Sequence, residues 1–129
     1  MTDAPPFKKP TEFELEILSA LWARGDSTVR DVHTVLCINR KLGYTTVLKA
    51  FQVMTEKGLV HRTEAGKAHI YAPVMSEEEM QTRLLTDLSQ KLFSGSTAAL
   101  AMHALSLNRA STEELDQIQA LINQRKGME

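Results

Sequence analysis

The sequence predicts a mostly α-helical protein with an N-terminal winged helix-turn-helix, made of three helices and a β-hairpin wing, and a C-terminal helical segment. Three observations support this fold class. Two amphipathic helical patterns precede residue 38, a third pattern with a polar face leads straight into two strand-like runs, and three more helical patterns follow residue 76. Three helices and a hairpin within so short a stretch pack most simply as a winged domain. We therefore expect a flexible arm at 1–10, a winged-helix domain at 11–75 and a helical dimerisation domain at 76–129.

The first two helices have clear start signals and apolar faces. Thr11 and Glu14 have the spacing of a capping box, which predicts a helix to about residue 23. Ser27 or Thr28 is expected to start the second helix, which runs to about residue 37. Their apolar faces predict burial of Leu15, Leu18, Leu21 and Trp22 in the first helix, and of Val29, Val32, His33 and Leu36 in the second.

The third helix and the hairpin occupy residues 43–74. Thr45 or Thr46 is expected to cap the helix, and Gly58 is expected to end it. Val47, Phe51 and Met54 recur at helical spacing and predict the buried face. The runs 59–63 and 68–74 read as two strands, joined by the glycine-containing charged tip 64–67.

The C-terminal segment predicts three helices: one from the Ser76/Glu79 capping box to about residue 93, one at 97–107, and one from the Ser111/Glu114 capping box. Short helices cannot easily bury their own apolar stripes, so we expect them to pair with a second copy in a two-fold dimer. Packing back onto the winged domain is the alternative. The residues expected in the dimer interface are Leu84, Leu88, Leu92, Leu100, Leu105, Leu115, Ile118 and Ile122.

Charge is distributed unevenly along the 129 residues. The net charge is −1, yet residues 30–67 carry seven Lys/Arg against three Asp/Glu, a local charge of +4. Such a local basic surface is what contact with a phosphate backbone requires. The sequence contains no apolar run long enough to span a membrane and begins with no hydrophobic signal segment, so a cytoplasmic location is expected. The single cysteine, Cys37, excludes an internal disulfide and is expected to be a buried small apolar residue.

The exposed face of the third helix carries side chains suited to reading DNA. Thr45, Thr46, Lys49 and Gln52 lie on or near one stripe of that helix. Threonine donates, accepts or contacts a thymine methyl, glutamine pairs with adenine, and lysine reaches phosphate or guanine. Residues expected to contact the DNA backbone around this stripe are Arg30, Arg40, Lys41, Arg62, Gly66 and Lys67, and Tyr44 is also expected at the DNA-binding surface.

Catalytic and metal-binding patterns are weak by comparison. The sequence has no GxSxG, HExxH or glycine-rich phosphate loop, so it predicts neither an enzyme nor a cofactor. His61 and His69 are placed where they can face each other across the hairpin. Two histidines without a third ligand nearby are more typical of a surface pair than of a metal site.

Several segments together resemble the BlaI/MecI/CopY family of penicillinase-type repressors: TEFELEILSALW at 11–22, YTTVLKAF and MTEKGLV at 44–51 and 54–60, and GKAHIYAPVMSEEE at 66–79. The resemblance covers nearly all of 11–122. It implies a winged-helix dimer that binds a dyad-symmetric, TACA…TGTA-like operator and blocks transcription. Under it, Thr45 and Thr46 take base-reading positions and Lys67 lies on the wing.

Two departures from that family concern how the repressor is released. Members controlled by a sensor protease are cut at an Asn–Phe bond, and this chain has His103-Ala104 at the corresponding place. Copper-responsive members carry paired Cys-x-Cys motifs near the C-terminus, and no cysteine follows Cys37. Control by copper through that route is therefore excluded, control by that cleavage is in doubt, and the inducing signal stays unassigned.

Two other functions are compatible with the predicted fold. A winged helix can serve as a protein-interaction module, although that use predicts an apolar patch where this chain has Thr, Lys and Gln. The chain can also be a regulator that responds to a small molecule or metal through a sensor site not evident in the sequence. Double-stranded DNA and a second copy of the chain are the partners we expect.

Overall fold

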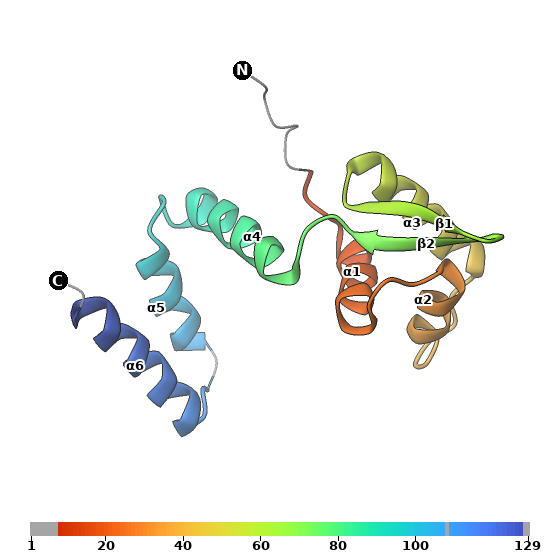
Figure 1. Cartoon of the computed structure of the whole chain (residues 1–129). Helices are drawn as coiled ribbons and strands as arrows, with labels where there is room; N and C mark the ends of the chain where they lie inside the picture. Colours follow the sequence, from red (N-terminus) through yellow and green to blue (C-terminus); the bar gives the residue numbers. More distant parts are fainter. Residues whose placement is uncertain (1–7, 108, 128–129) are drawn as a thin grey trace, which may run out of the picture. The chain divides into compact units, whose positions relative to one another are not determined.

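The computed structural model describes residues 8–107 and 109–127 and confirms the predicted fold class. Residues 1–7 of the expected flexible arm lie outside the described residues, while Lys8 and Lys9 are exposed and Pro10 is buried. The described elements are, in chain order, α1 (Glu12–Arg24), α2 (Val29–Leu36), α3 (Tyr44–Lys57), β1 (Val60–Ala65), β2 (Ala68–Pro73), α4 (Glu77–Leu92), α5 (Thr97–Leu107) and α6 (Thr112–Gly127) (Figure 1).

Reciprocal capping boxes start four of the described helices. In α1 the Thr11 hydroxyl accepts from the Glu14 amide at 3.1 Å, and the Glu14 carboxylate accepts from the Thr11 amide at 2.9 Å. Hydrogen bonds from the backbone and side chain of Thr28 lower the pKa of the Asp31 carboxyl in the box that starts α2. The predicted boxes of α4 and α6 are also formed, by Ser76 with Glu79 and by Ser111 with Glu114.

The predicted cap of α3 by Thr45 or Thr46 is wrong. The helix begins earlier, at Tyr44, and Gly43 is the N-cap residue without any side-chain capping bond. The Gly43 carbonyl instead accepts from the Thr46 amide at 3.2 Å. Both threonines therefore lie inside the first turn, where their side chains are exposed. At the other end Gly58 closes the helix in the left-handed conformation, with φ +78°, as predicted.

The hairpin has a shorter turn than the sequence suggested. Its pairing runs from Val60 opposite Pro73 to Ala65 opposite Ala68, so only Gly66 and Lys67 form the turn. This register places His61 opposite Ala72 and His69 opposite Glu64. The prediction that His61 and His69 face each other is therefore wrong.

The turn between α1 and α2 is joined to the hairpin by its backbone. The Tyr71 amide donates to the Ser27 carbonyl at 2.8 Å, and the Ser27 amide donates to the Tyr71 carbonyl at 3.1 Å. Both residues are buried. This reciprocal pair anchors the base of the hairpin, while the tip projects beyond the helices (Figure 1).

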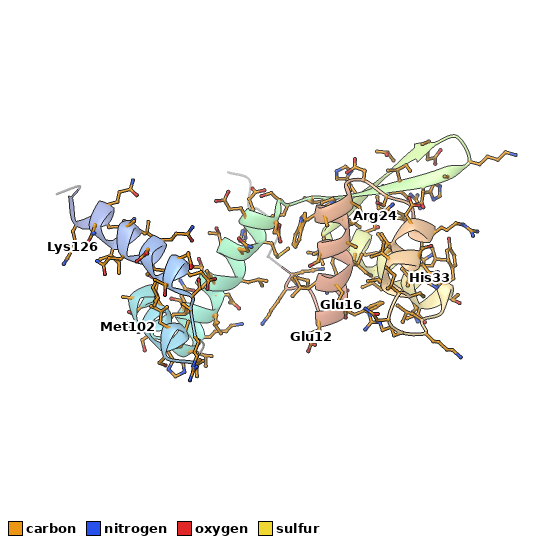
Figure 2. The ribbon with its side chains drawn as sticks, turned by 90° about the horizontal axis from the view of Figure 1, so that it is seen from below. Glu12, Glu16, Arg24, His33, Met102 and Lys126 are labelled. Atoms are coloured by element: carbon orange, nitrogen blue, oxygen red, sulfur yellow. The ribbon has the colours of Figure 1, made fainter. Side chains whose placement is uncertain are left out.

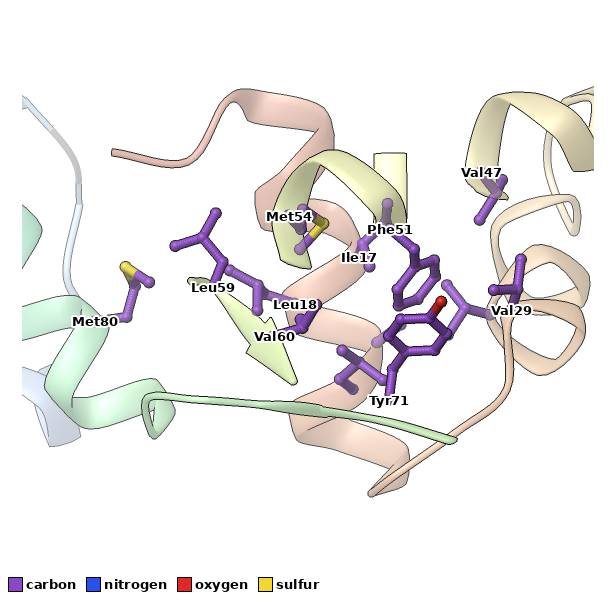
Figure 3. Close-up of a cluster of buried hydrophobic side chains, with 13 residues drawn as sticks. Ile17, Leu18, Val29, Val47, Phe51, Met54, Leu59, Val60, Tyr71 and Met80 are labelled. Carbon is purple, nitrogen blue, oxygen red and sulfur yellow. The ribbon is translucent and has the colours of Figure 1, made fainter. Parts of the chain in front are cut away.

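The core lies between α1, α2, α3 and the hairpin (Figure 3). The predicted inner face of α3, which consists of Val47, Phe51 and Met54, is fully buried. The rings of Phe51 and Tyr71 meet at a centroid distance of 4.5 Å. The remaining buried apolar residues are Ile17, Leu18, Ala20 and Leu21 of α1, Val29 and Val32 of α2, Leu59, Val60 and Met80. Burial of one face of α3 leaves its opposite face on the surface.

An ion pair links the beginning of α1 to the end of α3. The Lys57 ammonium lies 2.6 Å from Oε1 of Glu14, the same oxygen that accepts from the Thr11 amide. The two side chains are 20% and 6% exposed. Breaking such a pair is unfavourable because the charge that remains would be unpaired at a site shielded from water, which costs free energy.

The chain divides into two compact units, Met1–Leu84 and Leu85–Glu129. The division lies inside α4, whereas the sequence suggested a boundary ahead of it. Met80 of α4 is buried in the N-terminal core, and Leu84, expected in a dimer interface, is half-buried against that core. None of the described helices is both long and apolar enough to cross a membrane.

We expect Lys57→Met to lower the free energy of unfolding by about 3 kcal/mol, because it leaves the Glu14 carboxylate shielded and unpaired. The double variant Glu14→Gln/Lys57→Met should recover most of that loss, since neither charge remains. Urea denaturation measures both. Lys91→Met is the control, because it breaks an exposed pair with Asp87 and should cost less than about 1 kcal/mol. Equal losses in Lys57→Met and Lys91→Met would contradict the role of the Glu14–Lys57 pair.

Candidate nucleic-acid interface

The outward face of α3 forms a shallow hollow. Thr45, Thr46, Lys49 and Gln52, all predicted to face outward, line it together with Leu48, and its volume is about 340 Å³. All four predicted residues are exposed. The α3 side chains that the sequence assigned to base reading thus share one surface.

A second hollow, of about 420 Å³, lies between α2, α3 and the hairpin. It brings together three of the residues predicted to bind DNA: Arg30 from α2, Tyr44 from the start of α3 and Lys67 from the hairpin turn. Leu48 lines both hollows, so the two adjoin. The other residues that line the second hollow are Thr28, Val29, Ala68, His69 and Tyr71.

Gly66 determines where Lys67 is displayed. It has φ +66° and is the first of the two turn residues between Ala65 and Ala68. A glycine with positive φ at this position is typical of a type II′ turn, whose twist matches that of the paired strands. Lys67 follows it at the exposed tip and lines the hollow beside α3.

Most of the predicted cations around the two hollows are free to bind an anion. Within the described residues, Arg30, Lys41, Lys49 and Lys67 take part in no ion pair and are exposed. Unpaired exposed cations on one surface are what a phosphate backbone attracts.

Arg40 is arranged differently from the other predicted cations. Its Nη2 lies 2.6 Å from Oε1 of Glu16, and its guanidinium lies 5.7 Å from the ring centre of Phe13. Both partners belong to α1. The side chain that the sequence assigned to a DNA backbone is therefore already occupied by a carboxylate.

Tyr44 is positioned by a network that sequence reasoning missed. His33 of α2 (labelled in Figure 2) contacts the Leu42 carbonyl through Nε2 at 2.6 Å, and its ring meets that of Tyr44 edge-on at 5.6 Å. Because a carbonyl only accepts, this nitrogen carries the hydrogen. The Cys37 thiol also approaches the Leu42 carbonyl, at 3.4 Å, and is half-buried where full burial was expected. The four-residue spacing of His33 and Cys37 indicates a shared helix face, but their carbonyl partner is set by the fold.

His69 is another residue that the sequence did not assign to this surface. It lines the second hollow, and its Nε2 lies 3.9 Å from Oε2 of Glu64 across the hairpin. Only the register of the strands reveals this placement. Across the described residues, His, Cys, Asp and Glu form no group of three or more that is able to hold a metal ion.

Comparison with known proteins gives likenesses of three kinds: to a solved structure, to curated proteins and to a family model. The solution structure of apo-NmtR superposes with a TM-score of 0.44 at 20% identity, over 79% of this chain and 71% of that one. Two proteins of Mycobacterium tuberculosis, from strains CDC 1551 / Oshkosh and ATCC 25618 / H37Rv, are each called "Transcriptional regulator BlaI". Each is 36% identical over 107 residues, which span 81% of this chain and 76% of the relative. The sequence model of the family described as "Penicillinase repressor" matches residues 10–124.

We expect Lys49→Ala and Lys67→Ala each to weaken binding to duplex DNA and to flatten the dependence of log K on log salt by about 0.9 for each phosphate that is no longer neutralised. Fluorescence anisotropy between 50 and 200 mM salt measures the slope, a range over which the affinity of such a protein changes steeply. Lys126→Ala removes an exposed lysine from α6 and serves as the control. Unchanged slopes in both lysine variants would rule out this surface.

Proposed function

The chain belongs to the penicillinase repressor family, and on that premise we propose that it is a homodimeric transcriptional repressor that binds a dyad-symmetric operator. One observation carries the proposal. The polar face of α3 adjoins a hollow lined by cations from α2 and the hairpin turn, and the opposite face of the same helix is buried in the core.

Base reading is assigned to the outward stripe of α3. A helix placed in the major groove reads bases through side chains near its N-terminal end. Thr45 and Thr46 lie in the first turn of α3, with Lys49 one turn further and Gln52 beyond it. Hydroxyl, ammonium and amide groups in this order are able to address thymine, guanine or phosphate, and adenine.

Backbone contacts are assigned to the residues around that stripe. Arg30 and Lys67 supply unpaired charge at the second hollow, with Tyr44 supplying a hydroxyl beside them, and Lys41 supplies exposed, unpaired charge in the segment before α3. Gly66 lets the turn approach closely because it has no side chain. Contacts of this kind fix the position and orientation of the protein on the duplex, while sequence is read by α3.

Pairing of two copies is assigned to the C-terminal helices. No described residue of α5 or α6 is buried, and the helices leave many large apolar side chains exposed. Apolar surface of this extent is typical of an interface rather than of a monomer surface. The expected interface residues outside the N-terminal core are Leu88, Leu92, Leu100, Leu105, Leu115, Ile118 and Ile122, and Leu85 and Leu121 are exposed beside them.

Selection of bound sequences from random duplex DNA tests the operator. We expect a palindrome whose half-sites lie about 10 bp apart centre to centre, or a multiple of that distance, because two recognition helices of a dimer enter the same side of the duplex. Enrichment of a sequence without two-fold symmetry would contradict the proposed dimer. Failure to enrich any sequence would contradict the repressor.

Repeating the selection with Thr46→Ala tests base reading. We expect a changed preference at one position of each half-site, at about 1–3 kcal/mol per discriminated base, with an unchanged salt slope. Thr55→Ala is the matched control, because Thr55 lies near the other end of α3 and its hydroxyl donates to the Phe51 carbonyl. A uniform loss of affinity across all sequences would argue against direct reading by Thr46.

Sedimentation equilibrium tests the dimer. We expect Leu115→Asp to weaken dimerisation by at least tenfold, because it places a carboxylate in an apolar interface at a cost of roughly 1.4 kcal/mol or more. Leu115 is 49% exposed in the single chain, so the fold of the chain itself should survive. Gln117→Asp adds the same charge to the same helix and should leave the dimer intact. An unchanged dimer in Leu115→Asp would remove α6 from the interface.

A further inference from the structure

The connector between α2 and α3, residues 38–43, delivers α3 to the surface and is held at both ends. At its start the Ile38 amide donates to the Val35 carbonyl at 3.3 Å. At its end the Leu42 carbonyl accepts from His33 at 2.6 Å. Between these points the described contact that crosses to another element is that of Arg40 with Glu16 of α1 (Glu16 is labelled in Figure 2).

We propose that Arg40 is a positioning residue for the DNA-binding face and not a phosphate contact. The inference rests on the proposed function, and it reverses the role that the sequence suggested for Arg40. Its guanidinium bonds Glu16 at 2.6 Å and lies over the Phe13 ring at 5.7 Å. Phe13 and Glu16 are three residues apart on α1, so they lie on one face of that helix and hold the guanidinium together.

The position of Arg40 in the chain explains what this contact controls. Lys41 is the next residue, and α3 begins at Tyr44. A connector fixed to α1 at Arg40 therefore determines where Lys41 and the first turn of α3 are presented. That turn contains Thr45 and Thr46.

The charge of the Arg40–Glu16 pair argues against a phosphate contact by Arg40. A guanidinium paired with a carboxylate presents almost no net charge, and the same carboxylate repels an approaching phosphate. Counterion release needs cations that are not already neutralised. Lys41, Lys49 and Lys67 are exposed and unpaired among the described residues, and they meet that requirement.

The two roles predict opposite effects of removing Glu16. If Arg40 positions the connector, Arg40→Gln and Glu16→Gln should weaken DNA binding alike, by roughly two- to fivefold, with an unchanged salt slope. If Arg40 binds phosphate, Glu16→Gln should tighten binding by freeing the guanidinium, and Arg40→Gln should flatten the slope by about 0.9. Lys91→Gln, which breaks the exposed pair with Asp87 on α4, is the matched control and should change neither.

A charge exchange separates positioning from simple loss of a cation. In Arg40→Glu/Glu16→Arg the ion pair is kept with its polarity reversed, so affinity should return toward that of the unchanged protein. If residue 40 contacts phosphate, Arg40→Glu and the double variant both place a carboxylate against the phosphate, and exchanging Glu16 does not restore the lost contact. Binding by the exchanged protein that is no better than by Arg40→Glu alone overturns the proposal.

A measurement on the free protein distinguishes failure of this inference from failure of the proposed function. Hydrogen exchange of the amides of residues 41–46 should accelerate in Arg40→Gln and Glu16→Gln and recover in the charge-exchanged protein. Unchanged exchange in both single variants overturns the positioning role, whatever the affinity. A different outcome is that hydrogen exchange responds as expected but the protein without substitutions binds no duplex. In that case Arg40 positions the connector, and the proposed repressor function is wrong.

Discussion

The arrangement of the N-terminal unit depends on one shielded ion pair, between Glu14 and Lys57. A single carboxylate oxygen of Glu14 accepts both from the Thr11 amide and from the Lys57 ammonium. The start of α1 and the end of α3 therefore share one anchor. Because Gly58 turns the chain into β1 directly after Lys57, this anchor also fixes where the hairpin begins. α3 and the hairpin are thus oriented against α1 by a contact whose residues line neither hollow.

The surface that we assign to DNA is more positively charged than the chain as a whole. The overall charge of −1 conceals a local charge of +4 over residues 30–67, and three of those cations, Arg30, Lys49 and Lys67, line the two hollows beside α3. The described Lys and Arg side chains that do form ion pairs line neither hollow: Arg40 and Lys57 are tied to α1, and Lys91 to Asp87 on α4. The fold therefore separates cations that hold the protein together from cations that remain available to an anion.

Local patterns in the sequence predicted most of the fold, and long-range geometry accounts for what they missed. Three capping boxes and the inner face of α3 depend only on residues a few positions apart, so spacing alone revealed them. The partner of His61 depends on the length of the turn, and the two-residue turn shifts it to Ala72. The pairing of Arg40 with Glu16 joins residues that are 24 positions apart, so no local rule gives it. For the same reason the sequence identified the cations of the site without distinguishing which of them are already neutralised.

The reciprocal hydrogen bonds between Ser27 and Tyr71 fix the base of the hairpin to the turn between α1 and α2. Beyond these hydrogen bonds, residues 62–69 are all exposed, so the outer part of the wing adds no buried side chain to the core. Adding or removing one cross-strand pair would change the reach of the wing by about 3.3 Å without touching the core. The length of the wing can therefore change, by mutation or by design, to match the distance to a bound duplex. Such a change leaves the stability of the domain unaffected.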